Sequence, residues 1–379
     1  MDFELSEEQR LIQDMAYKFA VQEIAPKAKD HDRAEKYPKE IVQKAAELGM
    51  VGPTIPEEYG GAGYGFLEQA LIIEQMARVD LGITQAIESA AFGSQNIVFF
   101  GTEEQKQKYL PPLASGQAVA AGAYTEPDAG TDVAAVRTKA VRDGDDWVIT
   151  GNKMFITNGT ICDYLAVLCL TDPAAASPYQ RHSMIIVEAG LPGLEAKPIK
   201  GKMGLRASDT AEVALDGVRV PAGNLIGSQG QGFKQLMRFF DATRTIVAAQ
   251  GVGLAQGALD LAIAYAKERV TFGRPLISNQ ALQFKLAEMA TKIELARLAT
   301  YRAAWLVDQG RPDPTYNSMA KYWAGKTAVW VCDQALQVHG GYGYIDEYDI
   351  QRFYRDAKIL EIYEGTKEAE KMVIAKRLA

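Results

Sequence analysis

The sequence predicts an α+β protein of three domains, with helical domains at both ends and a β domain between them. The chain has 379 residues, more than one hydrophobic core normally serves. Short β-branched runs fill residues 118–229, whereas apolar residues recur every three and four positions on both sides. We therefore expect an N-terminal α-helical domain (1–117), a barrel-like or sandwich-like middle β domain (118–229) and a C-terminal four-helix bundle (230–379).

Composition limits the function classes. Apolar residues make up 47% of the chain and charged residues 23%, which is typical of a soluble globular protein. The net charge of −7 argues against nucleic acid as the main partner. No apolar run approaches the length of a membrane span. The acidic start, Met1-Asp2-Phe3-Glu4, resembles neither a signal peptide nor a transit peptide, so we expect a cytoplasmic protein.

Cysteine and histidine give no metal or disulfide pattern. The three cysteines are Cys162, Cys169 and Cys332, an odd number without a CxxC pair, and we interpret them as buried thiols in a reducing compartment. The three histidines are widely separated in the sequence. We therefore expect no metal site.

Helical signals fill the first domain. Residues 6–9 and 102–105 both fit a capping box, in which a Ser or Thr is followed three positions later by Gln. Glu88 falls inside a mostly apolar segment, and a buried acid there needs a partner or a purpose. The expected helices follow residue 6, begin near Pro38, span 67–78, span 83–100 as one buried helix, and run from 102 to the Pro111-Pro112 pair.

The middle segment has the signals of strands and hairpins. Apolar residues alternate on both sides of Asp143-Gly144 and again of Asp216-Gly217, so each pair predicts a hairpin turn. Residues 165–170 and 183–187 have strand length and β-branched content.

Helical periodicity returns after the glycine-rich loop at 227–232. Gly251, Gly253 and Gly257 suggest a dinucleotide fingerprint, but their spacing is wrong and they lie in a helical pattern. Close helix packing explains them better. The expected helices of the bundle are 233–269, 280–310, 314–339 and 350–377.

Residues 337–366 hold the most informative stretch. A glycine-rich turn leads into a charged helical run that ends in Ile362-Tyr363-Glu364-Gly365-Thr366. An apolar surrounding raises the pKa of a carboxylate, which makes a glutamate a useful base near neutral pH. From these residues alone, an ordinary surface glutamate before a helix-ending glycine is the favoured interpretation.

Five motifs in order resemble the acyl-CoA dehydrogenase family, and the pattern is most similar to its medium-chain and short-chain members. The resemblance covers nearly the whole chain. The motifs are YTEPDAGTD at 124–132, MFITNG at 154–159, RVTFG at 269–273, QVHGG at 337–341 and IYEGT at 362–366.

The resemblance implies a reaction. Members of this family oxidise an acyl-CoA thioester to the 2-enoyl-CoA, and FAD accepts the electrons. In this chain Glu364 would remove the C2 proton while hydride leaves C3 for flavin N5. The backbone N–H of Glu364 would stabilise the negative charge that develops on the thioester oxygen.

The resemblance also implies an FAD site. Thr125 and Thr157 would contact the flavin edge, and Phe155 stands where many members have tryptophan. Arg269 and Phe272 would reach the FAD of a neighbouring subunit, so a homotetramer (a dimer of dimers) is expected. The expected cofactor residues are Tyr124, Thr125, Thr131, Phe155, Thr157, Arg269, Phe272, Gln280, Gln337, Gly340, Gly341 and Thr366.

The substrate residues are less specific in sequence. Glu88 would lie at the floor of the acyl pocket, and Arg244 would contact CoA or form a structural ion pair. Glu368 replaces a family glutamine that contacts FAD, so we leave it out of the set. The expected substrate residues are Thr131, Glu88, Asp241, Arg244, Tyr363 and Gly365.

The expected partners are an acyl-CoA, short- to medium-chain in length, and an electron-transfer flavoprotein. Ile83 stands where glutaryl-CoA dehydrogenases have an arginine, which disfavours glutaryl-CoA. Three alternatives stay open: an alicyclic (cyclohexane- or cyclohexene-carboxyl) acyl-CoA dehydrogenase, an acyl-CoA oxidase, and a catalytically silent flavoprotein.

Overall fold

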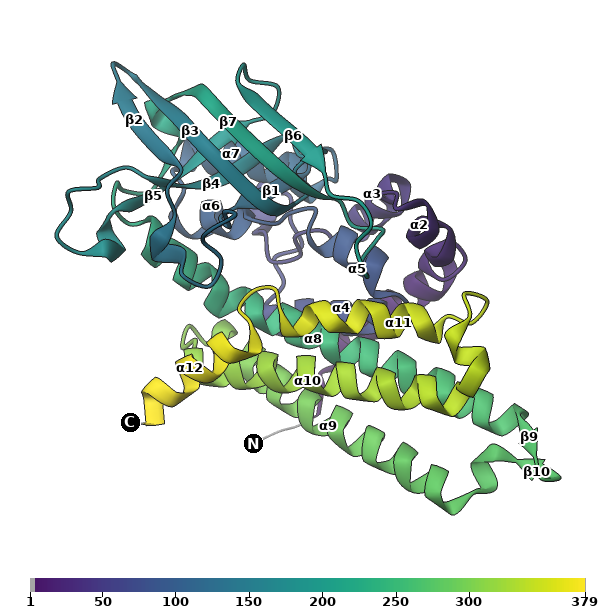
Figure 1. The fold of residues 1–379 in the computed structure, drawn as a ribbon. Coiled ribbons are helices and arrows are strands. Elements are labelled where there is room, and N and C mark those ends of the chain that lie inside the picture. The colour runs from purple at the N-terminus through teal and green to yellow at the C-terminus, as the bar shows by residue number, and fades with distance from the viewer. Residues whose placement is uncertain (1–3, 379) are drawn as a thin grey trace.

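The computed structural model describes residues 4–378, so Met1, Asp2 and Phe3 of the acidic start lie outside the described residues. Helices from the beginning and the end of the chain flank one large β-sheet formed by its middle (Figure 1). This arrangement confirms the predicted α+β fold class with helical domains at both ends.

The N-terminal helices begin where capping groups stop the preceding chain. Ser6 and Gln9 exchange both bonds of the predicted capping box, and Thr102 and Gln105 do the same. A short helix that the sequence analysis missed precedes Pro38. The helices are α1 (Glu7–Phe19), α2 (Ala28–Ala34), α3 (Lys39–Glu47), α4 (Phe66–Ala77), α5 (Leu81–Glu88), α6 (Ser94–Phe100) and α7 (Glu103–Ala114).

The expected single helix over 83–100 is wrong, because the chain breaks there into α5 and α6. Asp80 caps the start of α5 by accepting a hydrogen bond of 2.8 Å from the backbone N–H of Ile83. Gly93, with φ of 93°, turns the chain before α6. Glu88 therefore lies at the end of a helix and not in its middle.

The prediction that Pro111-Pro112 ends a helix is also wrong, since α7 continues to Ala114. Both prolines lie in its last turn. Their carbonyls accept hydrogen bonds from the backbone N–H groups of Ser115, Gln117 and Ala118. The carbonyl groups of both prolines therefore have partners, although the prolines themselves lack N–H donors.

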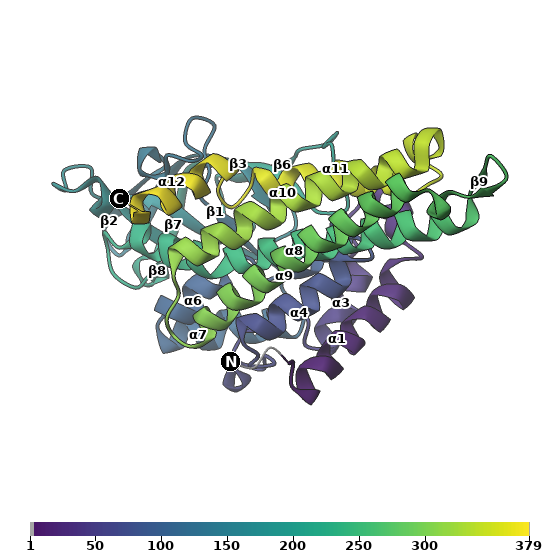
Figure 2. The ribbon, with the colours of Figure 1, turned by 90° about the horizontal axis from the view of Figure 1, so that it is seen from below.

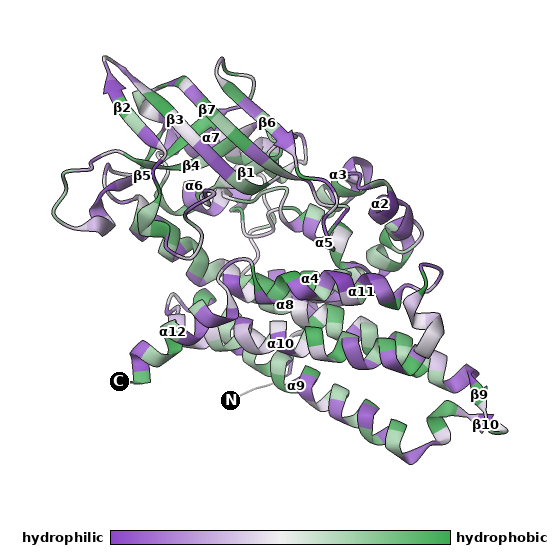
Figure 3. Cartoon of the chain, viewed as in Figure 1, coloured by the Kyte–Doolittle hydropathy of each residue, from purple (hydrophilic) through white to green (hydrophobic). Residues whose placement is uncertain are grey.

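The middle of the chain forms an 8-stranded sheet with the order β6-β7-β3-β2-β4-β5-β8, and β1 pairs in parallel with β4. Apolar and polar residues alternate along β3 and β7, as their banded colours show (Figure 3). One face of these two strands therefore packs against the protein, and the other faces solvent. The strands are β1 (Ala120–Ala123), β2 (Lys139–Asp143), β3 (Asp146–Thr157), β4 (Tyr164–Leu170), β5 (His182–Glu188), β6 (Leu194–Pro198), β7 (Thr210–Pro221) and β8 (Leu225–Ile226).

One of the two expected hairpins forms. Asp143 and Asp146 pair across the turn between β2 and β3, with Gly144 at φ of 62°. Asp216-Gly217 does not turn the chain, because β7 runs through it. Gly217 has φ of 65° and lies opposite a register shift in β3, so the pair forms a β-bulge.

The C-terminal domain is a bundle in which α8 (Gly232–Glu268), α9 (Gln280–Asp308) and α10 (Pro314–His339) run alongside one another (Figure 2). Helix α4 of the first domain packs against α8 and α9. A small hairpin of β9 (Val270–Thr271) and β10 (Arg274–Pro275) joins α8 to α9. The bundle thus shares its core with the N-terminal helices.

By length and composition, α8 qualifies as a membrane span, which the sequence analysis did not anticipate. Its most apolar window has a mean hydropathy of 1.5, and 78% of that window is buried inside the protein. Alanine and glycine dominate this helix, and they allow close packing against α4 and α10. We therefore interpret α8 as a core helix.

The fourth expected helix, 350–377, is interrupted. It divides into α11 (Ile350–Ala357), a 3₁₀ turn (Lys358–Glu361) and α12 (Lys367–Leu378). Glu364 and Gly365 lie in the break, both with positive φ. The stretch that the sequence analysis singled out is therefore a turn between two helices.

Candidate active site

Glu364 lies in a strained backbone conformation. Its φ is 53°, and Gly365 follows with φ of 101°. Left-handed φ is unfavourable for a residue with a side chain and is concentrated at functional sites. Phe155, Asn158 and Phe272 also have positive φ and lie in the motifs of the sequence analysis. Four of the six positive-φ residues other than glycine in the described part of the chain therefore lie in these motifs, and the other two, Glu35 and Leu205, lie elsewhere.

Three domains surround the Glu364 carboxylate. Thr243 of α8 donates a hydrogen bond of 2.5 Å from Oγ1 to Glu364 Oε2. The charge of Glu364 raises the pKa of Tyr124, which follows β1, and the pKa of Glu88, at the end of α5. Burial raises the pKa of Glu364 to about 7, although the Thr243 bond and the charge of Arg244 oppose this shift. Glu364 can therefore accept a proton near neutral pH.

Glu88 is a second carboxyl group with a raised pKa. Burial, reinforced by the charge of Glu364, raises the pKa of Glu88 to about 8, so the group is mostly protonated at pH 7. The charge of Glu88 also acts on the hydroxyl of Tyr363. That hydroxyl donates a hydrogen bond to Gln250, which in turn donates one of 2.8 Å to Gln85. Polar groups thus cluster on this side of Glu364.

The residues expected at the flavin edge lie on β3 and on the segment that follows β1. The carbonyl of Thr125 accepts a hydrogen bond of 2.9 Å from the backbone N–H of Met154, which brings Thr125 close to β3. Thr157 ends β3 and is half-buried, as is Thr125. Phe155 has a side chain 66% exposed, and Thr131 is exposed as well. An aromatic face and several hydroxyls are available here to a ligand.

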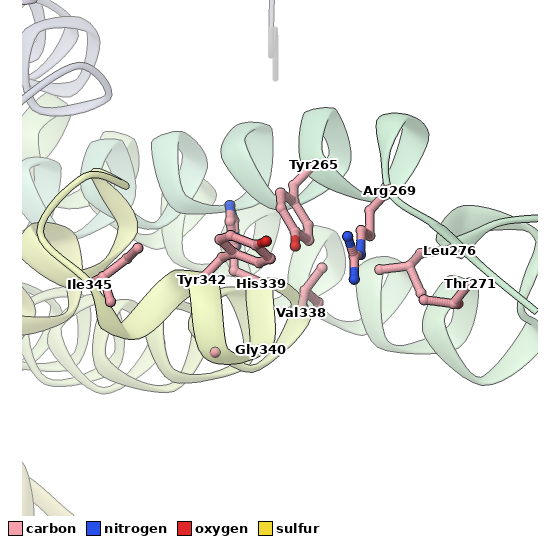
Figure 4. A pocket seen from close by; sticks show the side chains of 10 residues that line it. Tyr265, Arg269, Thr271, Leu276, Val338, His339, Gly340, Tyr342 and Ile345 are labelled. Carbon is pink, nitrogen blue, oxygen red and sulfur yellow. The ribbon is translucent and has the colours of Figure 1, made fainter.

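A second group of expected cofactor residues gathers at the other end of the bundle. Arg269, Gly340 and Gly341 line a surface cavity of about 430 Å³, where Arg269 stands beside Tyr342 and Tyr265 (Figure 4). Phe272, at the tip of the β9–β10 hairpin, is fully exposed. The remaining members of this group, also exposed, are Gln337 at the end of α10 and Gln280 at the start of α9.

The structure places Arg244 in ion pairs. Its Nε lies 3.1 Å from Oε1 of Glu370, and its guanidinium lies 3.5 Å from Asp241. Arg244 is only 8% exposed, which favours the ion-pair interpretation of this residue over a CoA contact. The hydroxyl of Thr366 accepts a hydrogen bond of 3.2 Å from Ala369 and so caps α12.

The sequence analysis missed three residues around Glu364: Thr243, Lys321 and Glu370. For Lys321, the sequence does contain a signal that predicts burial. Lys321 lies four residues after Asn317 and three before Ala324, and both of these are buried. Helical periodicity therefore places a lysine on the buried face of α10. Thr243 and Glu370 left no comparable signal, because their contacts join distant helices.

Comparison with known proteins agrees with the fold and the site. The N-terminal, middle and C-terminal domains of acyl-CoA dehydrogenases match residues 6–117, 121–218 and 230–379. A probable acyl-CoA dehydrogenase of Bacillus subtilis, YngJ, is 44% identical over 100% of both chains. The acryloyl-CoA reductase (NADH) of Anaerotignum propionicum is 41% identical over 100% of this chain and 96% of its own. The structure of butyryl-CoA dehydrogenase from Megasphaera elsdenii is 38% identical over 100% of both chains, with a TM-score of 0.95.

Two helical domains and a β domain that meet at a strained, half-buried glutamate define an oxidoreductase of the acyl-thioester type. The chain belongs to the acyl-CoA dehydrogenase family, whose members are flavoproteins.

Proposed function

We propose that this enzyme uses FAD to convert a short- to medium-chain acyl-CoA into the 2-enoyl-CoA, with Glu364 as the base. One observation carries the proposal: Glu364 is a carboxylate with a pKa of about 7, held on a left-handed turn where three domains meet. A base is most effective when its pKa is near the working pH.

The residues around Glu364 have separate roles. Glu364 takes the proton from C2, and Thr243 orients its carboxylate. The N–H of Glu364 donates to the thioester carbonyl, which gathers negative charge as the proton leaves. Gly365 and Tyr363 border the acyl group. Thr131 and Asp241 are the remaining residues proposed on the substrate side, whereas Arg244 holds its ion pairs with Asp241 and Glu370.

The residues present fit FAD in two places. The half-buried hydroxyls of Thr125 and Thr157 and the exposed face of Phe155 suit a flavin ring, and Tyr124 borders them. Arg269 and the side-chain-free Gly340 and Gly341 suit a pyrophosphate. When bound, FAD supplies the hydride acceptor. Gln280, Gln337 and Thr366 complete the proposed set.

The two places are far apart, which supports an oligomer. Lys321 contacts the Glu364 turn, and His339 lines the Arg269 cavity. Both residues lie on α10, and at 1.5 Å per residue they are about 27 Å apart. The ribityl chain of one FAD is too short to join two such sites. We infer that Arg269 and the exposed Phe272 serve the FAD of a neighbouring subunit in a homotetramer built as a dimer of dimers.

The polar cluster near Glu364 supports a limited acyl length. Gln85 and Gln250 are buried, and their amides are tied to Tyr363 and to each other. A long alkyl chain could extend further only by displacing these side chains, which would break their hydrogen bonds inside the protein. Glu88, whose charge acts on Tyr363, adds a further polar group to this wall. A short chain, or a ring with a polar edge, suits this wall better.

Two further parts of the proposal concern the electron acceptor and the location. The electrons pass to an electron-transfer flavoprotein, and the enzyme works in the cytoplasm. The named relatives include a reductase of acryloyl-CoA, so both directions of the reaction belong in the test.

The decisive experiment is anaerobic titration of the flavin-loaded enzyme with butyryl-, octanoyl- and cyclohexanecarboxyl-CoA. We expect the visible flavin absorbance to bleach with at least one of them. A Glu364→Gln variant should retain FAD and ligand binding but lose bleaching. If no acyl-CoA of any length bleaches the wild-type flavin, the proposed function is wrong. Oxygen consumption with peroxide release would instead identify an oxidase.

A further inference from the structure

Three helices each bring one buried charged side chain to the underside of the Glu364–Gly365 turn. Arg244 comes from α8, Lys321 from α10 and Glu370 from α12, and they are 8%, 1% and 0% exposed. Burying a charge is costly unless it is paired and hydrogen-bonded. Neither Lys321 nor Glu370 has a role in the site as described so far.

Both residues contact the turn directly. Lys321 Nζ donates a hydrogen bond to the backbone carbonyl of Gly365. At the same glycine, an added Cβ would lie 2.1 Å from Glu370 Oε1. That carboxylate oxygen also lies 3.1 Å from Arg244 Nε. Lys321 therefore holds the turn by its carbonyl, and Glu370 fills the space beside its α-carbon.

The same residues act on the charge of Glu364. Arg244 and Lys321 lower its pKa, whereas burial and the negative charge of Glu370 raise it. Burial lowers the pKa of Lys321 to about 8, so it is still largely a cation at pH 7. The titratable and charged groups that face Glu364 from its neighbours are Glu88, Tyr124, Asp241, Arg244, Lys321, Tyr363 and Glu370.

We propose that Lys321 and Glu370 are positioning residues for the proton transfer. They lock the Glu364–Gly365 turn in its left-handed conformation and so aim both the carboxylate and the N–H of Glu364. The proposal rests on the proposed role of Glu364 as the base. Neither residue touches the substrate; each acts through the turn.

The test compares Lys321→Met and Glu370→Gln in the flavin-loaded enzyme. Each variant should slow flavin bleaching by butyryl-CoA about tenfold or more at pH 7, because small misplacements of a reacting group cost this much. The pH profiles should move in opposite directions: the apparent pKa of the base rises when the cation is removed and falls when the anion is removed. Lys321→Arg, which retains charge and donors, should restore most of the rate.

A second readout follows the turn itself. Hydrogen exchange of the backbone amides of residues 362–367 should accelerate in Lys321→Met, with or without acyl-CoA. Lys371→Met is the matched control, because this exposed lysine of α12 lies outside the measured segment and its ammonium group packs over the ring of Tyr322. Glu288→Gln on α9 is the control for the acid. Neither control should move the pH profile or the exchange.

The outcomes separate this proposal from the proposed function. If Glu364→Gln abolishes bleaching but both test variants leave the pH profile and the exchange at wild-type values, the positioning roles are wrong and the base assignment stands. Shifts of both profiles in the same direction would also overturn the proposal. If no acyl-CoA bleaches the wild-type flavin, the proposed function fails, and the exchange experiment still decides whether Lys321 holds the turn.

Discussion

Thr243 donates a 2.5 Å hydrogen bond to Oε2 of Glu364 across a sequence separation of 121 residues. Thr243 is buried on the first helix of the bundle, and Glu364 lies in the break before the last helix. The bond fixes one oxygen of the carboxylate and stabilises its charged form. Part of the orientation of the proposed base thus depends on a residue outside its own segment.

Replacing Thr243 with valine should preserve the shape of the site and remove this bond. A hydrogen bond to a charged group contributes about 1.5–3 kcal/mol, so the bleaching rate at pH 7 should fall about tenfold or more. The apparent pKa of Glu364 should rise, because the bond lowers it in the wild type. Rapid-mixing measurements of flavin bleaching from pH 6 to 9 test this.

Thr243→Ser is the matched control, since it keeps the hydroxyl and should stay near the wild-type rate. A Thr243→Val enzyme with an unchanged rate and pH profile would mean that the hydroxyl does not orient the base.

Glu88 and Glu364 should make the folded protein less stable as the pH rises. Both have pKa values raised by burial, to about 8 and about 7, so the folded state keeps protons that the unfolded state releases above pH 4.5. Their stabilising contribution is complete below pH 4.5 and is lost as the pH rises through 7 and 8. Glu88→Gln should therefore reduce the fall in melting temperature between pH 6 and pH 9.

Calorimetry on the wild type and Glu88→Gln measures this fall. The control is Glu104→Gln, which changes an exposed glutamate. An equal fall in all three proteins would show that Glu88 is already ionised in the folded state at neutral pH.

Local signals in the sequence predicted most of the elements, and they failed where contacts between distant segments decided the outcome. Capping boxes located the starts of α1 and α7 correctly. Asp216-Gly217 has the local chemistry of a hairpin turn, but pairing with β3 keeps β7 continuous and converts the pair into a bulge. The long helix expected around Gly93 breaks because the chain there packs against the backbone of Ala121 and Gly122.

The candidate site shows the same division. Glu364 and the two threonines proposed for the flavin edge lie in contiguous motifs, so resemblance could single them out as candidates. Thr243, Lys321 and Glu370 act on Glu364 from three helices that only the fold brings together. No local pattern around Glu370 reveals that its carboxylate lies beside Gly365.

The tip of the β9–β10 hairpin should control assembly and FAD retention. Phe272 is fully exposed in the single chain and has φ of 50°, a conformation that is unfavourable for a residue with a side chain and is concentrated at functional sites. Its ring at the hairpin tip is therefore available to a neighbouring subunit. Phe272→Ser should weaken the tetramer and the retention of FAD about tenfold or more. Light scattering after size exclusion and flavin absorbance after dialysis measure the two effects.

Val141→Ser is the comparison variant, because Val141 is a 61% exposed apolar residue on β2. It should leave assembly and flavin content unchanged. If Phe272→Ser also remains a fully loaded tetramer, the hairpin does not reach a neighbouring FAD.

The buried pair of Lys153 and Glu126 should stabilise β3 and the Tyr124–Thr125 segment, which carry the threonines proposed for the flavin edge. Lys153 Nζ lies 2.9 Å from Glu126 Oε1, and it donates further hydrogen bonds of 3.1 and 2.8 Å to the carbonyls of Tyr124 and Leu168. Lys153→Met would leave Glu126 buried without its cation, at a cost of about 3–5 kcal/mol. The double variant Lys153→Met/Glu126→Gln should cost less than the sum of the two single changes, because no unpaired charge remains.

Chemical denaturation of the four proteins gives the coupling free energy, and the flavin absorption spectrum reports whether the strands have moved. The exposed pair of Arg219 and Asp143 on the same sheet provides the control, since Arg219→Met removes a similar contact that water already screens. Additive losses in the Lys153 and Glu126 cycle would contradict the prediction. In that case the conformation of the Tyr124–Thr125 segment would have to depend on its backbone pairing with Met154, not on the buried charges.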